Sequence, residues 1–269
     1  MKTKFLCALC AALVAHALTP SLFAITEGEA RIQLIKHHPK GPTIKVLVLQ
    51  DVEGALVEVK GPYNVYDPNT GKKLETAFSG SSYYMHPTTD GIKWGSEFPG
   101  VFQVLIVPDN AKTTFLLQGV EYHGMLYCYQ ADGTIGYVNE LTIDDYADSL
   151  VACITQEKVL DKEAFAALAI AARADALYKI KHGASKFWHV KGSLVNYIGA
   201  ACTRTDRPFL DAMKETQGMV LDLNQQIGWF NNNPVPITEI QQQAIDGKTA
   251  KAILRSYFPD SSISISKSE

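Results

Sequence analysis

The most informative segment of the chain is 137–177, YVNELTIDDYADSLVACITQEKVLDKEAFAALAIAARADAL. Its first residues alternate as in a strand, and the pattern then becomes helical. Thr142 and Asp145 have the spacing of a capping box, which predicts a helix from there to about Cys153. A short junction follows, and Glu157 is the glutamate in it. The segment therefore predicts a strand that runs directly into two successive helices.

The second of these helices is unusually rich in alanine. Asp161 is placed to cap its start, and His182-Gly183 mark its end. Apolar residues at helical spacing predict one buried stripe, formed by Phe165, Leu168, Ala169, Ala172, Ala176 and Ile180. Because alanine is small, neighbouring backbone can approach closely. We therefore expect Glu157 to lie in a wall rather than on a loose surface.

Before this unit, from about Thr43 to Tyr137, the sequence is typical of β-structure. Apolar and polar residues alternate, and turn residues separate the runs. The expected strands are 44–49, 55–60, 63–66, 102–107, 113–117, 125–130 and 134–138. Asp132-Gly133, between the last two runs, predicts a tight hairpin.

After this unit the sequence is mainly helical. The expected elements are a strand over 190–197, a helix from Asp206 to Gly218, a strand over 219–223, a helix with a Thr238/Gln241 capping box, and a helix capped by Thr249. The serine-rich tail from Ser261 is expected to fray. Strands dominate the first half and helices the second, so the predicted fold class is α+β.

The N-terminus resembles a secretory signal peptide. Two lysines precede an apolar run over 5–18 that is too short to span a bilayer, and Ala24 suits a cleavage site. We expect 1–24 to be removed and the mature protein to be exported, to the periplasm or cell envelope, with no integral membrane segment. The predicted parts are then a β-rich part over 25–137, a helix-rich part over 138–260 and a flexible tail over 261–269.

Cysteine and charge content narrow the possible functions. Cys7 and Cys10 lie in the leader, where Cys10 would also suit a lipoprotein anchor. The others, Cys128, Cys153 and Cys202, allow one disulfide at most or three buried thiols, and no spacing resembles a zinc site. The net charge is −3, or −5 without the leader, so the chain has no excess positive charge that would attract nucleic acid. We predict no nucleic-acid partner, no metal and no cofactor.

Motifs spread over 44–259 resemble the stage II sporulation protein D family, also called SpoIID/LytB. VNELTIDDYADSLV at 138–151 is similar to the family phrase VNELPLEDYLYGVV, and AALAIAARADAL at 166–177 to KAQAVAARTYAL. Further phrases similar to the family's, in the family's order, are GPYNVY at 61–66, YHGML at 122–126, TQGMVL at 216–221 and ILRSYFP at 253–259.

The resemblance implies an exported protein that acts on bacterial peptidoglycan through a mixed fold around a glycan groove. Some members are lytic transglycosylases that cleave peptide-free glycan strands, and others enhance cell-wall amidases. The family's catalytic glutamate stands soon after the VNEL helix in a Glu-Met-Pro phrase. Glu157 takes its place here, without that phrase and with altered spacing. The family's Cys/His pair and its later HSSCGG phrase are missing, so metal binding is not carried over.

The implied chemistry needs a single acid–base group. In a lytic transglycosylase one residue protonates the leaving oxygen and then accepts the proton of the sugar's own primary hydroxyl. Glu157 would need a dry, apolar setting to keep its proton at neutral pH. The alternative is an ordinary solvated glutamate.

Four further residues complete the candidate site. Arg173 is expected either to hold its helix against the sheet, through a carboxylate such as Glu140, or to contact a sugar. Tyr146, Tyr197 and Trp229 are either sugar-stacking platforms or core residues.

The leading hypothesis is therefore a lytic transglycosylase with Glu157 as acid and base. The alternative is a non-catalytic glycan-binding protein or amidase enhancer, and a third possibility is an exported structural or interaction protein. The expected partners are peptidoglycan glycan strands and, in the alternative, a cell-wall amidase.

Overall fold

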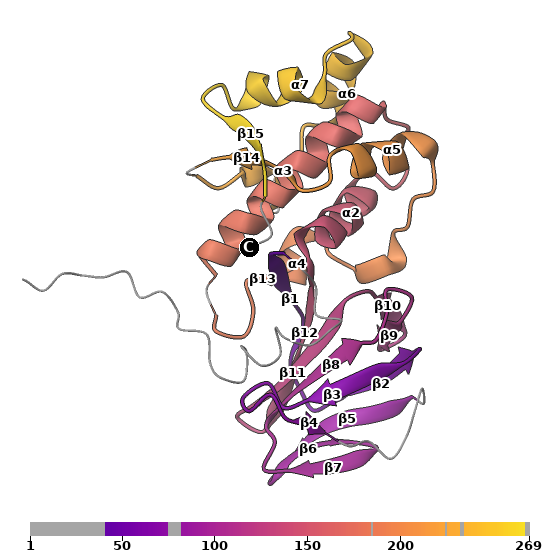
Figure 1. Ribbon diagram of the computed structural model, residues 1–269, viewed down its shortest axis with the longest axis vertical. Helices are drawn as coiled ribbons and strands as arrows, with labels where there is room; N and C mark the ends of the chain where they lie inside the picture. Colours follow the sequence, from indigo (N-terminus) through magenta and orange to yellow (C-terminus); the bar gives the residue numbers. More distant parts are fainter. Residues whose placement is uncertain (1–40, 75–81, 184, 224, 232–233, 267–269) are drawn as a thin grey trace, which may run out of the picture.

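The computed structural model describes residues 41–74, 82–183, 185–223, 225–231 and 234–266. The expected signal peptide lies outside these residues. The strands from β1 (Thr43–Val52) to β12 (Thr134–Thr142) occupy one end of the molecule. The helices and a small pair of strands occupy the other, and β1 and β12 reach up to the helices (Figure 1). The predicted α+β class, with strands mainly in the first half and helices in the second, is confirmed.

The strands of the first half form two sheets. The seven-stranded sheet has the order β13 (Val190–Lys191), β1 (Thr43–Val52), β12 (Thr134–Thr142), β11 (Met125–Ala131), β8 (Gln103–Pro108), β3 (Tyr63–Tyr66) and β4 (Lys73–Leu74). The six-stranded sheet has the order β10 (Val120–Tyr122), β9 (Thr114–Leu117), β2 (Ala55–Lys60), β5 (Tyr83–Thr88), β6 (Gly91–Trp94) and β7 (Ser96–Pro99). Neighbouring strands are antiparallel except β1 and β13.

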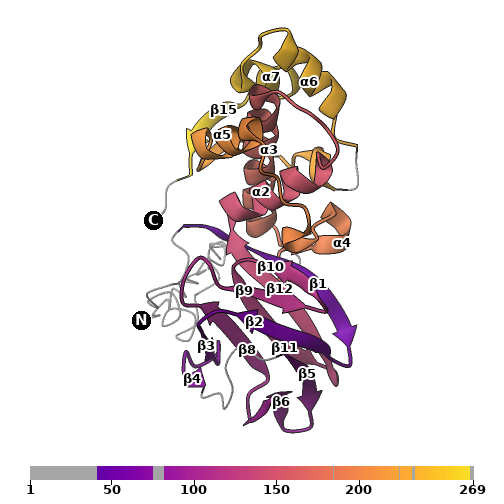
Figure 2. The same ribbon diagram turned by 90° about the vertical axis from the view of Figure 1, so that its right-hand side faces the viewer.

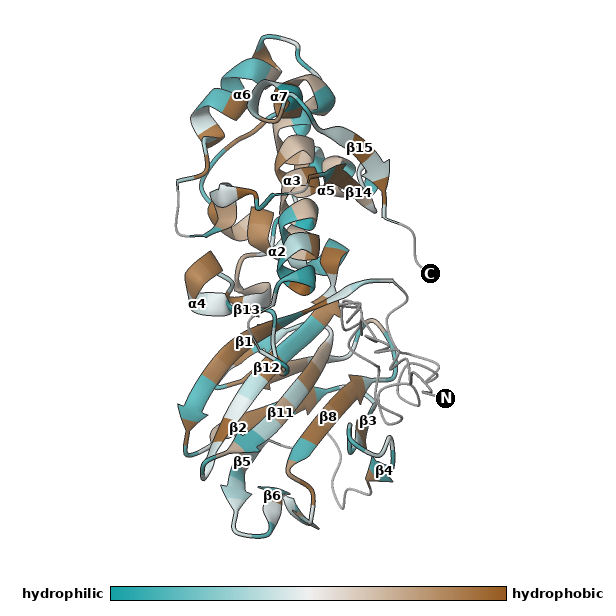
Figure 3. Cartoon of the chain, turned by 90° about the vertical axis from the view of Figure 1, so that its left-hand side faces the viewer, coloured by the Kyte–Doolittle hydropathy of each residue, from teal (hydrophilic) through white to brown (hydrophobic). Residues whose placement is uncertain are grey.

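The two sheets share one apolar core, which includes residues of both. Tyr137 of β12 crosses between them, and its hydroxyl donates to the Met85 carbonyl of β5 over 2.7 Å. The opposite face of the seven-stranded sheet carries a second apolar cluster, against which Phe187 and Trp188 pack. Strand β8 is therefore buried on both faces, which explains its continuous hydrophobic colour in Figure 3.

The Asp132-Gly133 hairpin is confirmed. Ala131 pairs with Thr134, which leaves a two-residue loop between β11 and β12. Asp132 has φ 49° and Gly133 has φ 78°. Positive φ at both positions is the geometry of a type I′ turn, which aspartate followed by glycine favours.

The second half contains the helices and a small third sheet. The helices are α2 (Ile143–Ile154), α3 (Lys162–Lys181), α4 (Gly192–Val195), α5 (Arg207–Glu215), α6 (Ile237–Ile245) and α7 (Ala250–Tyr257), with 3₁₀ turns at Gly199–Ala201 (η1) and Gly228–Phe230 (η2). Strands β14 (Met219–Asp222) and β15 (Ser262–Ile265) pair antiparallel. The expected caps Thr142, Asp161 and Thr249 each accept a hydrogen bond from a backbone N–H of the first turn.

Helix α3 is the centre of this half. Helices α2, α5, α6 and α7 and strand β14 all pack against it (Figure 2). The predicted single stripe is too narrow, because α3 is buried on every side and even Arg173, Asp175 and Lys179 are inside. The high alanine content fits this position, since small side chains allow several elements to approach one helix.

Three local predictions are wrong. In 190–197 only β13 is a strand, and α4 follows it directly. Helix α6 begins one residue before Thr238, with Pro236 as its N-cap and no side-chain cap, so Thr238 and Gln241 form no capping box. The tail is not frayed over Ser262–Ile265, because that segment is β15 and pairs with β14. No helix in the described part of the chain is long and apolar enough to cross a membrane.

Candidate functional site

At the strand-to-helix junction, Asn139 is the centre of a buried network of hydrogen bonds. Its Nδ2 donates to the carbonyls of His123, over 2.8 Å, and Met125, over 3.1 Å. Its Oδ1 accepts from the Tyr197 hydroxyl over 2.5 Å. Asn139 is 0% exposed. The asparagine of VNEL thus joins β12, the start of β11 and the segment after α4, and its satisfied hydrogen bonds offset the cost of burial.

The next residue, Glu140, does not pair with Arg173. Its carboxylate accepts from the Thr43 hydroxyl over 2.7 Å and lies 3.9 Å from the Lys45 ammonium. The predicted Arg173–Glu140 contact is therefore wrong, because Glu140 points along the sheet to β1. Near it, the Lys45 N–H donates to Nδ1 of His189, and burial, assisted by Lys45, lowers the pKa of His189 to about 4. His189 is thus neutral at pH 7, and its role is structural.

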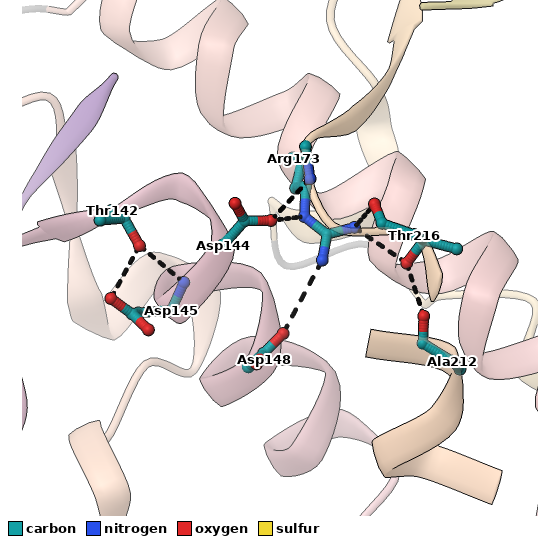
Figure 4. A network of polar contacts seen from close by, with 8 residues as sticks. Thr142, Asp144, Asp145, Asp148, Arg173, Ala212 and Thr216 are labelled. Atoms are coloured by element: carbon teal, nitrogen blue, oxygen red, sulfur yellow. Dashed lines mark hydrogen bonds and ion pairs between the residues drawn. The ribbon is translucent and has the colours of Figure 1, made fainter. Parts of the chain in front are cut away.

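Arg173 joins three elements of the helical half instead (Figure 4). Its Nε binds the Asp144 carboxylate of α2, and its Nη1 donates to the Thr216 carbonyl, 2.9 Å, and hydroxyl, 3.1 Å. Asp144 also accepts from the Gly218 N–H over 3.1 Å. The guanidinium is buried, and these contacts engage its Nε and Nη1 atoms. It clamps α2 to α3 and to the turn before β14.

Asp148 lies at the open side of this cluster. One of its oxygens is 3.9 Å from Nη2 of Arg173, and 44% of its side chain is exposed. Burial of that oxygen raises the pKa of Asp148 to about 6, although the Arg173 charge acts in the opposite direction. The pKa of Asp148 is thus closer to neutrality than that of an ordinary carboxyl, but Asp148 belongs to the Arg173 cluster and not to the Glu157 turn.

The structure places Tyr146 and Tyr197 in the interior. Their rings stack with centroids 5.8 Å apart, and the exposed fractions of the residues are 0% and 6%. Tyr122 packs on the other side of Tyr197, at 6.2 Å. Neither ring offers an open face in this structure, so the geometry gives both a packing role.

Glu157 lies in the turn between α2 and α3 and is exposed. No hydrogen bond or ion pair of its carboxylate is formed within the described residues. The turn itself is fixed, because Nη1 of Arg204 donates to the carbonyls of Thr155, over 2.5 Å, and Lys158, over 3.1 Å. The Arg204 guanidinium in turn lies over the Phe165 ring, 4.8 Å from its centroid. Glu157 is thus an open carboxylate on a well-anchored turn.

A hollow of about 460 Å³ opens beside the end of α2. The residues that line it are Ile154, Val195, Asn196, Trp229, Phe230, Pro234, Val235 and Ile237. Trp229 is half-buried, and its ring meets Tyr257 edge-on at 5.1 Å, which fixes its orientation. Within the described residues, the lining has no charged side chain, and Glu157 is not part of it. The volume falls in the range of roughly 300–1,000 Å³ that is usual for small-ligand sites.

Sequence reasoning missed most of this hollow. Asn196 has φ 55°, at the C-cap of α4, which brings its exposed amide to the rim. The strand expected over 190–197 concealed it, although Asn is one of the residues that can take the left-handed conformation at a helix end. Arg204 was missed as well. Its Nε donates to the nearby Asp206 carboxylate over 2.8 Å, but its contacts with the Glu157 turn are to backbone carbonyls, which leave no side-chain signal. No three His, Cys, Asp or Glu side chains of the described residues gather closely enough to hold a metal ion.

The described residues form an α+β protein with a buried polar strand-to-helix junction before α2 and a hollow with an uncharged lining beside the end of α2. The model of the stage II sporulation protein family, SpoIID, matches residues 131–222. That range contains the junction, α2, α3 and the Arg173 clamp. The chain belongs to the SpoIID family, and this membership supports a cell-wall-related function.

Similar proteins occur in three bacteria. An uncharacterized protein of Chlamydia pneumoniae is 33% identical over 227 residues, which cover 81% of this chain and 80% of the relative. One of Chlamydia muridarum is 31% identical over 230 residues, 84% of this chain and 79% of the relative. One of Brachyspira hyodysenteriae is 31% identical over 132 residues, 48% of this chain and 34% of the relative. No solved structure matches the chain.

Proposed function

We propose that this protein is exported and binds peptidoglycan glycan strands in the hollow beside α2, as a glycan-binding protein or amidase enhancer. The observation that carries the proposal is the chemistry of the hollow. Trp229 supplies an aromatic wall and Asn196 an amide, and the described lining residues carry no charge. Sugar rings present apolar C–H faces and hydroxyl or acetamido edges, so they match an aromatic ring next to an amide.

The positions of the carboxylates favour ligand binding at the hollow without catalysis there. An acid catalyst must lie within hydrogen-bond reach of the bond that it cleaves. The α2 residue that lines the hollow is Ile154, whereas Glu157 is exposed beyond it. The hollow therefore supports recognition of a neutral ligand better than proton transfer to it. Tyr146, Tyr197 and Arg173 are not among the residues that line the hollow, and in this proposal they hold the surrounding elements in place.

The binding test uses the full chain and soluble peptide-free glycan strands, with affinity measured by calorimetry. We expect Trp229→Ala to weaken binding about tenfold, since loss of one stacked aromatic ring costs about 1 kcal/mol or more. Asn196→Gly removes the amide and keeps the positive φ, and it should weaken binding without changing stability. The control is Tyr84→Ala on β5, where the side chain is exposed and distant from the hollow. Unchanged affinity in both hollow variants would overturn the proposal.

A second candidate, a lytic transglycosylase that uses Glu157, is favoured by one observation. The turn that carries Glu157 is anchored by Arg204 and begins directly after Ile154, so its carboxylate is on a rigid element next to the hollow. For this function, Glu157→Gln should lower formation of 1,6-anhydromuramic ends by at least about 100-fold, the usual contribution of an acid–base group. Mass spectrometry of digested glycan strands measures these ends.

The matched control for that experiment is Glu239→Gln, which removes an exposed glutamate charge from α6. Equal product from wild type and Glu157→Gln would exclude Glu157 from the chemistry. Absence of product from wild type, with glycan binding retained, would exclude the transglycosylase and leave the binding function.

A further inference from the structure

Two of the three cysteines outside the leader lie beside the hollow. Cys153 is in the last turn of α2, next to Ile154, and is partly exposed. Cys202 follows η1, and its Sγ lies 3.8 Å from Oε1 of Gln156, in the turn after α2. Cys128, by contrast, is fully buried in β11. Residues about fifty positions apart in the sequence are thus brought to one place at the end of α2.

The end of α2 and the segment that carries Cys202 lie against each other. Helix α2 contacts η1, which ends directly before Cys202. Burial, followed by the nearby Cys202 thiol, raises the pKa of Cys153 to about 12, while the Ile198 N–H acts in the opposite direction. The contact of Cys202 with Gln156 is a separate contact that places Cys202 against the same end of α2.

We propose that Cys153 and Cys202 are a modification site at which a disulfide forms in an oxidising environment. The oxidant is a small disulfide or a disulfide-bearing oxidoreductase. The thiolate of one cysteine attacks the oxidant, which releases one thiol and leaves a mixed disulfide. The second cysteine then displaces the other thiol, so two protein S–H bonds are exchanged for one S–S bond and the oxidant is reduced to two thiols.

The bond would join the two walls of the hollow. Ile154 follows Cys153 on one wall, while Val195 and Asn196 precede Cys202 on the other. Arg204, two residues after Cys202, already fastens the Glu157 turn through backbone carbonyls. A covalent link at 153–202 would thus lock the segment 195–204 to the end of α2, and the hollow between them would keep one shape.

The test is peptide mapping of the wild-type chain. The protein is incubated with oxidised and reduced glutathione at about pH 8.5 until the exchange reaches equilibrium, and is then alkylated under denaturing conditions. Cleavage after glutamate separates the three cysteines, because Cys128, Cys153 and Cys202 fall in the peptides 122–140, 141–157 and 164–215. We expect 141–157 linked to 164–215, two hydrogens lighter than the sum, and Cys128 alkylated.

A second readout is thermal unfolding. The oxidised protein should melt about 5–15 °C above the reduced protein, because the bond closes a long loop. Cys202→Ser should abolish both the cross-linked peptide and the difference between oxidised and reduced protein. Cys128→Ala, the control, should keep both. Full alkylation of all three thiols, a glutathione adduct on one cysteine, or a link that includes Cys128 would overturn the proposal. The cross-link is measured without glycan, so its failure is distinct from failure of the binding function.

Discussion

Arg173→Met is expected to lower the free energy of unfolding by about 3–5 kcal/mol, the usual cost of removing one partner from a buried ion pair. The variant keeps an unbranched apolar stem but leaves the Asp144 carboxylate and the Thr216 carbonyl without the guanidinium. Asp144 would keep its bond from the Gly218 N–H, which is weaker than the charged contact. Urea unfolding followed by circular dichroism measures the change.

The control for this variant is Arg207→Met in α5. The Arg207 side chain is 91% exposed and pairs with Asp211 over 3.3 Å, so its loss should change stability by less than about 1 kcal/mol. The comparison also separates the two roles predicted for Arg173. A variant as stable as wild type that has lost glycan binding would show contact with a sugar, and would contradict the clamp.

Gly124→Ala is expected to lower the free energy of unfolding by about 2–4 kcal/mol. Alanine is disfavoured in the left-handed backbone conformation of this residue, and its Cβ would be overpacked against its neighbours. Gly124 has φ +84°, and an added Cβ would lie 2.5 Å from the Glu140 carbonyl oxygen. That oxygen belongs to β12 at the strand-to-helix junction, so it cannot move without disturbing Asn139 and its partners. The glycine of the YHGML phrase is thus required by close approach of backbone.

The matched control is Gly119→Ala. Gly119 has φ +81°, almost the same conformation, but nothing lies within 4 Å of its added Cβ. Gly119→Ala should therefore lower the free energy of unfolding only by the cost of the left-handed conformation, about 1–2 kcal/mol. The difference between the two variants measures the steric contribution of the junction. Equal losses in the two variants would show that the backbone at Glu140 yields.

The glycan-binding proposal assigns ligand binding and structural support to different parts of this chain. The family phrases supply Asn139 and Arg173, which are both buried and satisfied. The hollow, in contrast, is lined mostly by residues outside those phrases, such as Asn196 and Trp229. In this proposal the shared phrases build the support, and the connecting segments form the surface to which the glycan would bind.

Local sequence patterns were sufficient to predict the fold class, most strands, the tight hairpin and three helix caps. These features depend on local chemistry: alternation sets a strand, Asp132-Gly133 takes positive φ, and Thr142 reaches the N–H of Asp145. The same local chemistry placed α3. For Arg173 it left two roles open, holding its helix against the sheet or contacting a sugar, and the partner that it suggested, Glu140, was wrong.

Which residues share the site depends on contacts between distant parts of the chain. The partners of Arg173 are 29 and 43 positions away in the sequence, and the long-range partners of Arg204 are backbone carbonyls, which no side-chain pattern reveals. The tail gained a strand because β14 offered it an edge. The hollow exists because α2, α4, η2 and α6 leave a space where they meet, and packing between distant elements fixes such a space, which propensity cannot do.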